Sequence, residues 1–576
     1  MAFAILDSVV LGCALLGSVL IGLYYRITGG RQKTTEEYIL GDKNLSVIPV
    51  GFSLMASFMC ATTMFGLSSE NYMRGTHFMV INASNILGTP IVAYLFLPVF
   101  FKLGYVSIYQ YLEERFGKMV RTATSLAFSL QTILRTALVL YAAAIATDAI
   151  TGIPQVISMI GVGVICIFYS TIGGIKAVII TDLFQSILMF ASVFAVIIIS
   201  ALEVGGLTEI WNIANEYGRV NFSNFQIDPT VRHSWWSLFI GGMFTYVSVY
   251  ATNQVQVQRY LTMKNYDAAV KTLWFSWPLT AFLSLAMCFS GLAIFVKYRD
   301  CDPLKTHRIE SGEQLMSLFV LDTMGSIPGL TGLYLSGVWS SAMCTVSAAL
   351  NSLAAVTLED YILPFSRAEL SDKNRVVFLK LMVIVYGILS IMLGYCAQYV
   401  GSLLEASMSL LGIIGGPILA IFTLGIFVPY VNQKGSLIGL TIGLVFLFVI
   451  GLGGPKPRLK NLPTYTNGCK FENNLINSTL SVTPIYKDSE SYIYLFRISY
   501  MYYIVLGFLT TSVVALIASL CFKSDVKDLK PILLSSLVSK RIMNESENAR
   551  NKRIKIVRSV SNSKSMKKIE IPIKKV

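Results

Sequence analysis

The stretch Gly51-Phe-Ser-Leu-Met-Ala-Ser-Phe-Met-Cys-Ala-Thr-Thr-Met-Phe-Gly66 is mostly apolar, but small and hydroxyl residues crowd its middle. Leucine, the usual residue of lipid-facing helices, occurs in it only once. Such a composition suits a membrane helix that unwinds at mid-membrane and offers backbone carbonyls to an ion. It equally suits close packing of small residues between helices, so the stretch alone leaves both interpretations open.

Apolar blocks of similar length recur along the whole chain. Of its 576 residues, 54% are hydrophobic and 14% are charged, whereas roughly a quarter of the residues of a soluble domain are charged. The blocks are about 20 residues long, as a bilayer-crossing helix requires, and they lack the alternation of a β-barrel. The sequence therefore predicts an all-α integral membrane protein. About thirteen transmembrane helices are expected, at residues 5–25, 47–68, 78–103, 121–148, 154–172, 177–203, 237–258, 271–297, 328–357, 376–398, 405–429, 435–453 and 498–522.

The seventh predicted span, residues 237–258, has the same mixed character as the second. Gly241 and Gly242 are expected to loosen one end of it. Asn253, Gln254 and two further glutamines make the other half too polar to face lipid. A simple amphipathic exit at the cytoplasmic surface would explain Gln258 and Arg259 well, but it explains Gln254 less well.

The spacing of these two spans predicts an inverted repeat. They lie five spans apart, and because five is odd they would begin two five-helix halves of opposite topology. A binding site between two broken helices is typical of that arrangement. The repeats are expected at about 47–203 and 237–429, inside a transmembrane domain that covers residues 1–523.

Positive charge is concentrated at the C-terminal end. The net charge of the chain is +14, and the segment from Lys523 to Val576 holds 15 Lys/Arg and 5 Asp/Glu, a net charge of +10. A basic segment directly after a span predicts a cytoplasmic tail, residues 524–576, that contacts anionic lipid and is mostly disordered. It carries no nucleic-acid-binding motif. The basic loops between the spans place the C-terminus in the cytoplasm and the N-terminus outside.

Two longer loops on the predicted outer side carry signals of an extracellular environment. Asn221-Phe-Ser and Asn477-Ser-Thr are glycosylation acceptor motifs in these loops. Cys301 and Cys469 also fall in predicted outer loops, where a disulfide is possible. Spacing alone does not determine whether the two cysteines pair with each other.

Charged side chains inside the predicted spans are expensive and therefore indicate function. Asp182 is the lone carboxylate of the sixth span, and Gln185 follows it by three residues. A cation ligand or coupling carboxylate is favoured over a partly solvated terminal charge. Arg135 lies near the middle of the fourth span. A buried guanidinium needs a carboxylate, a bound anion or backbone carbonyls, so Asp182 and an anionic solute are both candidate partners.

Hydroxyl residues cluster in the ninth span. Ser341 and Thr345 are four residues apart and share a helix face, with Ser340, Cys344 and Ser347 on a neighbouring stripe. Hydroxyls in apolar helices often donate to their own helix carbonyls, and that role is the alternative. Hard oxygen ligands on one face suit Na⁺, whereas a thiol does not.

Short motifs spread over residues 36–520 are highly specific in combination. They are Met55-Ala-Ser-Phe-Met, Glu70-Asn-Tyr-Met-Arg-Gly, Leu97-Pro-Val-Phe, Tyr111-Leu-Glu-Glu-Arg-Phe, Gly173-Gly-Ile-Lys-Ala-Val, Thr181-Asp-Leu-Phe-Gln, Asn253-Gln-Val-Gln-Val-Gln-Arg-Tyr, Asp300-Cys-Asp-Pro and Ala354-Ala-Val-Thr-Leu-Glu-Asp. Together they resemble the sodium/solute symporter family. The most similar branch holds the sodium–iodide, sodium-coupled monocarboxylate and sodium-dependent multivitamin transporters.

The resemblance implies a five-plus-five inverted-repeat core of the leucine-transporter type and Na⁺ as the coupling ion, with no other metal or cofactor. The sodium-site positions of the family match Ser57, Asp182, Gln185, Gln254 and Thr345, and Ser341 matches a position that lends a backbone oxygen in some relatives. Cys60 and Thr63 match positions in the solute and second-ion region. Arg135, Tyr246 and Tyr250 are predicted to belong to the same region.

Two positions depart from the pattern of the family. Cys344 stands where relatives often have Ser, which weakens one hydroxyl ligand. Arg135 stands where the iodide and monocarboxylate members have Tyr. A fixed positive charge there could bind a carboxylate solute or replace one coupling cation. Both the solute and the number of coupled ions depend on which of these roles it has.

The sequence thus predicts a plasma-membrane symporter that imports Na⁺ together with a small organic anion. A monocarboxylate or a carboxylate vitamin such as biotin or pantothenate is the expected solute. An iodide or neutral-solute symporter and a non-transporting solute sensor on the same fold are the alternatives. An enzyme is not expected, because the spans hold no Ser/His/Asp set or metal-ligand cluster and the chain has only three histidines.

Overall fold

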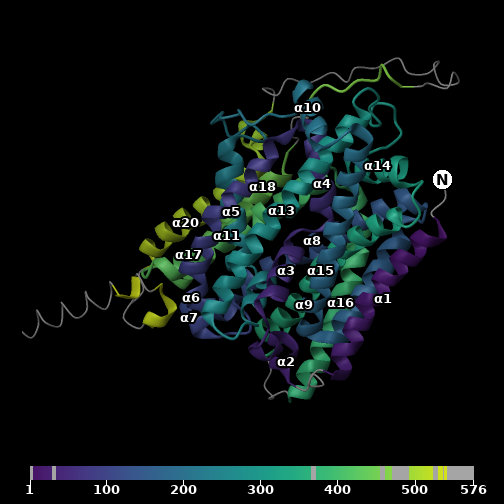
Figure 1. Cartoon of the computed structure of the whole chain (residues 1–576). Helices are drawn as coiled ribbons and strands as arrows, with labels where there is room; N and C mark the ends of the chain where they lie inside the picture. Colours follow the sequence, from purple (N-terminus) through teal and green to yellow (C-terminus); the bar gives the residue numbers. More distant parts are fainter. Residues whose placement is uncertain are drawn as a thin grey trace, which may run out of the picture.

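The computed structural model describes residues 4–28, 34–364, 371–454, 461–469, 492–522, 530–535 and 538–540. Over these residues the chain forms one bundle of packed helices (Figure 1). The membrane-crossing elements are α1 (Ile5–Thr28), α3 (Val47–Phe58) with α4 (Ala61–Arg74), η2 (Thr76–Val80) with α5 (Ile81–Ile91), η3 (Val92–Phe96) and α6 (Leu97–Leu103), α8 (Lys118–Thr151), α9 (Gln155–Val204), η4 (Ser237–Gly241) with α11 (Gly242–Thr252) and α12 (Gln254–Tyr260), α13 (Tyr266–Tyr298), α15 (Leu330–Val356) with η6 (Thr357–Ile362), α16 (Asp372–Cys396), α17 (Leu403–Phe427), α18 (Gln433–Leu452) and α20 (Tyr503–Cys521).

Length and composition identify the spans within the described residues. Ten helices are long and apolar enough to cross a membrane, and the bent pair α3–α4 makes an eleventh. Helix α9 has 50 residues, which at 1.5 Å per residue is far longer than a bilayer is thick, so it accounts for two predicted spans. The elements η4, α11 and α12 together account for the predicted seventh span. The expectation of an all-α polytopic membrane protein is confirmed.

The second span is broken at its middle. Helix α3 ends at Phe58, α4 begins at Ala61, and their axes differ in direction by 60°. Met59 and Cys60 between them have extended or irregular backbone angles. Several buried small residues of α3 and α4 also pack against neighbouring helices. Both interpretations of the 51–66 stretch therefore describe part of its structure.

The seventh span is broken too, but not where its glycines predict. Asn253 has an extended backbone and separates α11 from α12, and its side chain caps α12 by accepting a hydrogen bond from the Val255 amide at 2.9 Å. Gly241 and Gly242 have helical backbone angles. A Cβ atom at Gly241 would collide with the Met501 carbonyl and one at Gly242 with the Ser84 hydroxyl. The glycine pair therefore permits close helix packing and does not loosen the helix.

Helix α9 is divided by a single residue. Gly174 has φ 62° and ψ −168°, a conformation that side-chain-bearing residues avoid. The Tyr38 hydroxyl donates to the carbonyl of Ser170 at 3.2 Å, and the Tyr38 ring lies 3.1 Å from where a Cβ of Gly174 would be. The kink separates the two spans that the sequence predicts here, and it places Asp182 two turns into the second of them.

Helix α15 occupies the centre of the bundle. Its most apolar window is entirely buried, and it packs against α9, α8 and α1. Because lipid does not reach this helix, its many hydroxyl residues face other helices. The ninth predicted span is thus the one whose polar residues are best placed to line a site within the protein.

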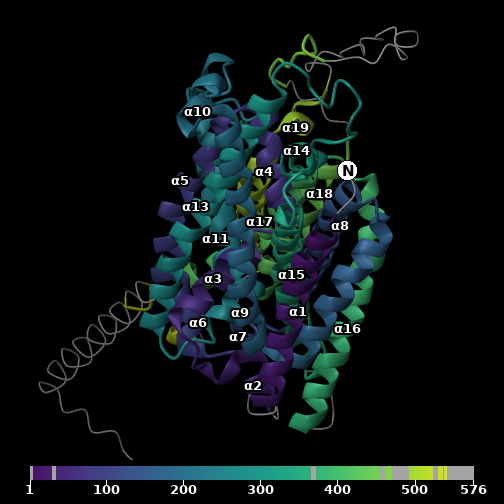
Figure 2. The same ribbon diagram turned by 45° about the vertical axis from the view of Figure 1, so that its right-hand side comes forward.

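The two ends of the bundle are distinct in Figures 1 and 2. Helices α10 (Leu207–Glu216) and α14 (Leu315–Met324) lie at one end, toward which the N-terminus also lies. Helices α2 (Thr35–Leu40) and α7 (Tyr109–Phe116) lie at the opposite end. We refer to these as the α14 end and the α7 end.

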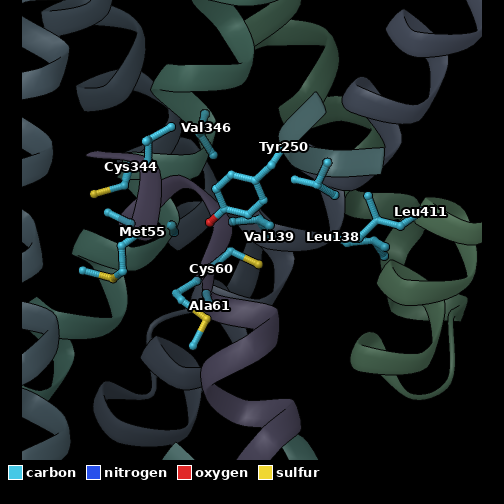
Figure 3. Packing of buried hydrophobic residues seen from close by; sticks show 14 of the residues in the cluster. Met55, Cys60, Ala61, Leu138, Val139, Tyr250, Cys344, Val346 and Leu411 are labelled. Carbon is cyan, nitrogen blue, oxygen red and sulfur yellow. The ribbon is translucent and has the colours of Figure 1, made fainter. Parts of the chain in front are cut away.

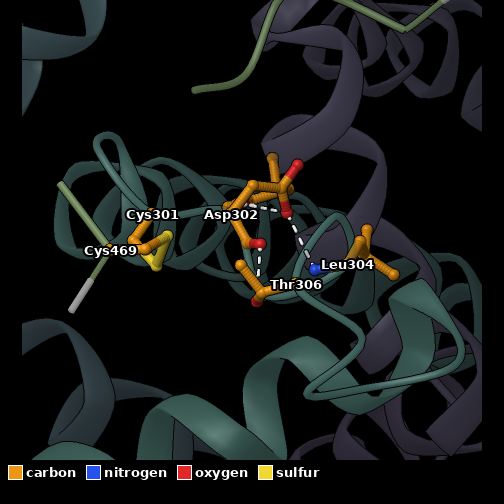
Figure 4. Close-up of a disulfide and its surroundings, with 6 residues drawn as sticks. Cys301, Asp302, Leu304, Thr306 and Cys469 are labelled. Atoms are coloured by element: carbon orange, nitrogen blue, oxygen red, sulfur yellow. Dashed lines mark hydrogen bonds between the residues drawn. A yellow bond between two sulfur atoms is a disulfide. The ribbon is translucent and has the colours of Figure 1, made fainter. Parts of the chain in front are cut away.

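A disulfide between Cys301 and Cys469 belongs to the α14 end. The two Cα atoms are 4.9 Å apart, and 168 residues separate them in the chain. Beside the disulfide, the Asp302 carboxylate accepts a hydrogen bond from the Leu304 amide at 2.9 Å. The backbone carbonyl of Asp302 accepts one from the Thr306 hydroxyl at 3.0 Å (Figure 4). The amide of Asp302 donates to the carbonyl of Tyr465. The disulfide thereby fastens residues 461–469 to the segment that follows α13.

Candidate functional site

The break in the second span lies against the hydroxyl face of α15. The Thr345 hydroxyl lies 3.5 Å from the Ser57 carbonyl and 3.3 Å from the Ser341 carbonyl. Ser57 lies in the last turn of α3, immediately before the break. The structure therefore brings together three of the six predicted sodium-site residues, from two helices far apart in the sequence.

The oxygen atoms of Ser57, Ser341 and Thr345 can still accept a further hydrogen bond or coordinate a cation. The Ser341 hydroxyl donates to the carbonyl of Val338 at 2.7 Å, and the Ser57 hydroxyl donates to the carbonyl of Ser53 at 2.8 Å. A hydroxyl that has donated its one proton retains its lone pairs. Back-bonding to the helix and cation coordination are thus compatible, although the sequence presents them as alternatives. All these side chains are buried.

Asp182 forms a second group, one turn of α3 further toward the α7 end. Its Oδ2 accepts from the Ser53 hydroxyl at 2.5 Å and lies 3.0 Å from Nη2 of Arg259. Ser53 precedes Ser57 by four residues, so the two groups are about 6 Å apart along α3. The hypothesis that Asp182 pairs with Arg135 is wrong, because its ion-pair partner is Arg259.

Gln185 lies beside the Asp182 group. Its amide nitrogen donates to the Ser18 hydroxyl of α1 at 3.0 Å, and its carbonyl oxygen accepts from the thiol of Cys344 at 3.0 Å. Cys344 thus contributes a weak donor at the place where a serine hydroxyl would offer hard lone pairs. In this conformation the amide of Gln185 has a protein partner on both of its ends.

Gln254 does not join either group. Its carbonyl oxygen accepts from the Ile108 amide at 3.0 Å and its nitrogen donates to the Val106 carbonyl at 2.8 Å, in the segment before α7. Gln256 contacts Ser57 instead. Its side-chain nitrogen lies 3.1 Å and its side-chain oxygen 3.3 Å from the Ser57 hydroxyl. The two residues differ by two positions on a short helix and so point to different sides of it.

Arg135 lies at the broken end of α3. Its Nη2 donates to the carbonyl of Phe58 at 3.3 Å and lies 3.9 Å from the sulfur of Cys60. Phe58 is the last residue of α3, so this contact serves a carbonyl that the break deprives of a helical partner. The Nε of Arg135 is buried and has no hydrogen-bond partner in the described part of the chain.

A cavity of about 50 Å³ lies next to Arg135, between the two broken spans. Thr63 of α4 and Tyr246 of α11 also line it, as do the side chains of Asn82, Asn85, Thr245, Thr280, Ser284 and Ser407. Apolar residues, among them Phe58 and Leu411, form the rest of its wall. One guanidinium, several neutral polar groups and an apolar wall suit a small anion that has an apolar part.

Cys60 and Tyr250 do not line the cavity but contact residues that do. Tyr250 stacks on Tyr246 with ring centroids 4.3 Å apart, and Figure 3 shows it among the packed side chains near Cys60 and Met55. The Cys60 sulfur lies 2.9 Å from the hydroxyl of Thr62. Of the five residues predicted for the solute region, Thr63, Arg135 and Tyr246 line the cavity. The other two support it.

The predicted glycosylation sites and the predicted basic tail can be located only in part. Asn221 is exposed in the loop before η4, where its side-chain oxygen accepts from the amide of Ser223 at 2.9 Å. Asn477 and most of the predicted tail lie outside the described residues. Among the described tail residues, Leu533 is buried and its carbonyl accepts from the Tyr111 hydroxyl of α7.

Sequence reasoning missed Ser53, Gln256 and Arg259. Ser53 lies in the quoted polar stretch, one turn before Ser57, and that spacing could have drawn attention to it. Arg259 lies in a predicted amphipathic exit, where a charge is ordinarily solvated. Its burial depends on the break at Asn253, which redirects the following helix.

Comparisons with known proteins identify the family of this chain. The sequence pattern of the sodium:solute symporter family matches residues 38–443. A Drosophila melanogaster protein provisionally named a sodium-dependent multivitamin transporter is 49% identical over 510 residues, which cover 88% of this chain and 84% of that protein. The human sodium-coupled monocarboxylate transporter 1 is 39% identical over 547 residues, covering 92% and 89% of the two chains.

A solved structure has the same fold. The substrate-bound, outward-open structure of a Na⁺-coupled sialic acid symporter superposes with a TM-score of 0.74, covering 90% of this chain and 98% of that one, at 24% identity. At that identity the match establishes the architecture alone. With the family pattern over most of the chain and two such relatives, the protein belongs to the sodium:solute symporter family of membrane transporters.

Proposed function

We propose that this protein imports a small organic anion together with Na⁺ across the plasma membrane. The observation that carries the proposal is the position of Arg135 at a cavity between the two broken helices, with its Nε buried and without a hydrogen-bond partner among the described residues. An unpaired buried donor of a guanidinium is costly, and a carboxylate oxygen would satisfy it with a charge-assisted hydrogen bond. The names of the relatives, a multivitamin transporter and a monocarboxylate transporter, favour carboxylate solutes.

The size of the cavity favours the smaller of these solutes. A volume of about 50 Å³ holds on the order of four water molecules. A short monocarboxylate is of comparable size, whereas a vitamin with a ring system and a long side chain requires a wider conformation. We therefore place monocarboxylates first and carboxylate vitamins second.

We assign the first sodium site to Ser57, Ser341 and Thr345. Their hydroxyl and carbonyl oxygens converge where α3 ends, and the C-terminal end of a half-helix carries the partial negative charge that a cation needs. Asp182 and Gln185 are proposed as ligands of a second cation. Gln254 is not included in either set, because its amide binds Ile108 and Val106, away from both groups.

The proposed orientation places the α14 end outside. The disulfide and the exposed Asn221 both lie there, and extracellular surroundings permit both a disulfide and glycosylation. Inward Na⁺ movement would then offset the cost of bringing an anion into a negative interior, about 2.3 kcal/mol per charge per 100 mV.

A solute screen tests the proposal. The purified protein is reconstituted in liposomes, and uptake of labelled lactate, nicotinate, biotin, pantothenate, iodide and glucose is measured in Na⁺ and in choline. We expect Na⁺-dependent uptake of at least one carboxylate and none of glucose. Uptake of iodide or glucose alone would refute the organic-anion assignment, and binding of a solute without any flux would favour the sensor alternative.

A further inference from the structure

A buried guanidinium lies directly on a carboxylate that we propose as a cation ligand. The side chains of Arg259 and Asp182 are only 1% and 0% exposed, and Nη2 lies 3.0 Å from Oδ2. The Nε of Arg259 donates to the Ser53 hydroxyl at 2.6 Å and its Nη1 to the Val255 carbonyl at 2.7 Å. The three residues Ser53, Asp182 and Arg259 come from α3, α9 and α12.

The two oxygens of Asp182 are used unequally. Oδ2 accepts from both Ser53 and Arg259, whereas Oδ1 is buried and has no hydrogen-bond partner among the residues that the structure describes. The thiol of Cys344 also lies beside this carboxylate, but it donates to Gln185. An orphaned carboxylate oxygen therefore points to a ligand, although the charge of the carboxylate is already matched by Arg259.

Charge balance allows only one cation at Asp182 at a time. A cation added beside the intact ion pair would leave a net positive charge in the protein interior, which is strongly unfavourable. A cation that replaces Arg259 would leave the site neutral and would satisfy Oδ1 as well. Arg259 and a small cation are thus competitors for the same carboxylate.

Arg259 lies near the end of a short half-helix that follows a break in the backbone. It lies in α12, a half-helix that begins after the break at Asn253 and ends at Tyr260, one residue beyond Arg259. A short half-helix beside an extended residue can shift as a unit while α3 and α9 stay in place. Loss of the contact with Asp182 would remove the ion pair between α12 and α9, while Gln256 would keep its contact with Ser57 of α3.

We propose that Arg259 is an internal counter-cation that alternates with Na⁺ at Asp182, so that cation binding there breaks the ion pair between α12 and α9 and loosens α12. The inference rests on the proposed sodium coupling and deepens it. Arg259 touches neither Na⁺ nor solute in this scheme. It is a positioning residue, and it sets whether the second cation is bound.

The test compares Arg259→Gln, Arg259→Lys and the double variant Arg259→Gln/Asp182→Asn with the parent protein. Binding of ²²Na⁺ to purified protein and Na⁺ flux without solute in liposomes are measured. Arg259→Gln leaves Asp182 uncompensated, so we expect Na⁺ binding roughly tenfold tighter and a Na⁺ leak. Arg259→Lys keeps the charge and should stay near the parent, and the double variant should lose both gains.

A second measurement uses the unaltered protein. Hydrogen exchange of residues 254–260 is followed with and without Na⁺, and release of Arg259 predicts faster exchange of α12 in Na⁺ than in choline. Unchanged or slower exchange, or unchanged Na⁺ affinity in Arg259→Gln, would show a static structural pair. If the parent protein itself takes up no solute in a Na⁺-dependent manner, the proposed function fails, which is a separate outcome.

Discussion

At the scale of single residues, Thr345 is the side chain on which the proposed first sodium site depends most. Its hydroxyl is the one that faces the broken end of α3, 3.5 Å from the Ser57 carbonyl. We expect Thr345→Ala to raise the Na⁺ concentration for half-maximal uptake by roughly tenfold, as loss of one oxygen ligand worth about 1.4 kcal/mol would do. The measurement is uptake against Na⁺ concentration at saturating solute.

The matched control for Thr345→Ala is Ser347→Ala. Ser347 lies on the same helix, is also buried, and donates to the Cys344 carbonyl of its own helix at 3.2 Å. Its removal should leave the Na⁺ dependence unchanged. An equal shift in both variants would mean that the hydroxyls of α15 act through packing and not as ligands.

Arg135 contacts the Phe58 carbonyl and is proposed to bind the solute, and one substitution can separate these two roles. Arg135→Gln retains a donor for the Phe58 carbonyl but removes the positive charge. If the guanidinium binds the solute carboxylate, the apparent solute affinity should fall by about 10- to 100-fold, the effect of losing a charge-assisted hydrogen bond worth about 1.5–3 kcal/mol. Na⁺ affinity at saturating solute should change little. An unchanged solute affinity would assign Arg135 to the helix end alone.

His233, at the α14 end, makes stability depend on pH. It lies in the loop before η4, where burial first and then Arg232 and Arg74 lower its pKa to about 3, against the opposite effect of Glu70. The folded protein therefore binds this proton less readily than the unfolded chain, whose pKa is about 6.5. Its stabilising effect is complete above pH 6.5 and declines as the pH falls from there toward 3.

The predicted loss is about 1.4 kcal/mol between neutral pH and pH 5.5. His233→Gln cannot gain a proton, yet it can keep partners for the Tyr500 hydroxyl, 2.8 Å from the imidazole, and for Glu70. The apparent Tm of the parent should therefore fall more between pH 7.5 and 5.5 than that of the variant. Parallel curves for the two proteins would contradict the assignment.

The sequence could predict residue types in the site better than residue contacts. Ser57, Ser341 and Thr345 follow from hydroxyl spacing and the family resemblance, because each lies on a regular helix near the break. The contact of Gln256 with Ser57 and the burial of Arg259 could not be predicted, since both depend on the direction that α12 takes after Asn253. A two-residue difference on a helix selects a different neighbour, and no single sequence resolves it.

At the scale of elements, both broken spans could be predicted, but only one break could be located. The first break, at Met59 and Cys60, lies in the middle of the 51–66 stretch, where hydroxyl and small residues predict it. In the seventh span, glycine was the misleading signal, because glycine serves close packing as well as flexibility. The polar residue Asn253 marks the break, since its side chain can cap the helix that restarts after it.

The kink of α9 is the element-scale feature most sensitive to substitution. Gly174→Ala would place a Cβ at φ 62° and 3.1 Å from the Tyr38 ring. Strain of about 1–3 kcal/mol is expected from the backbone alone, and it should lower the apparent Tm. Gly161→Ala is the control in the same helix, because its backbone is helical and its Cβ would meet Trp339 at an ordinary 3.6 Å. Equal Tm values would show that the kink tolerates a side chain.

At the scale of the whole molecule, composition and block length sufficed to predict an all-α membrane protein. The pairing of helices distant in sequence did not follow from them. Helices α3 and α15 are about 290 residues apart, and their contact at Ser57 and Thr345 depends on the inverted-repeat topology. The five-span spacing of the two polar spans predicts that topology, and the family resemblance implies it as well.

Coupled transport of Na⁺ and solute is a property of the whole molecule, and a gradient experiment measures it. Sealed proteoliposomes receive equal labelled monocarboxylate on both sides and a Na⁺ gradient as the sole driving force. We expect the solute to accumulate on the side of low Na⁺, a reversed gradient to reverse the accumulation, and choline to abolish it. Equal solute concentrations at all times, despite measurable solute exchange, would contradict symport.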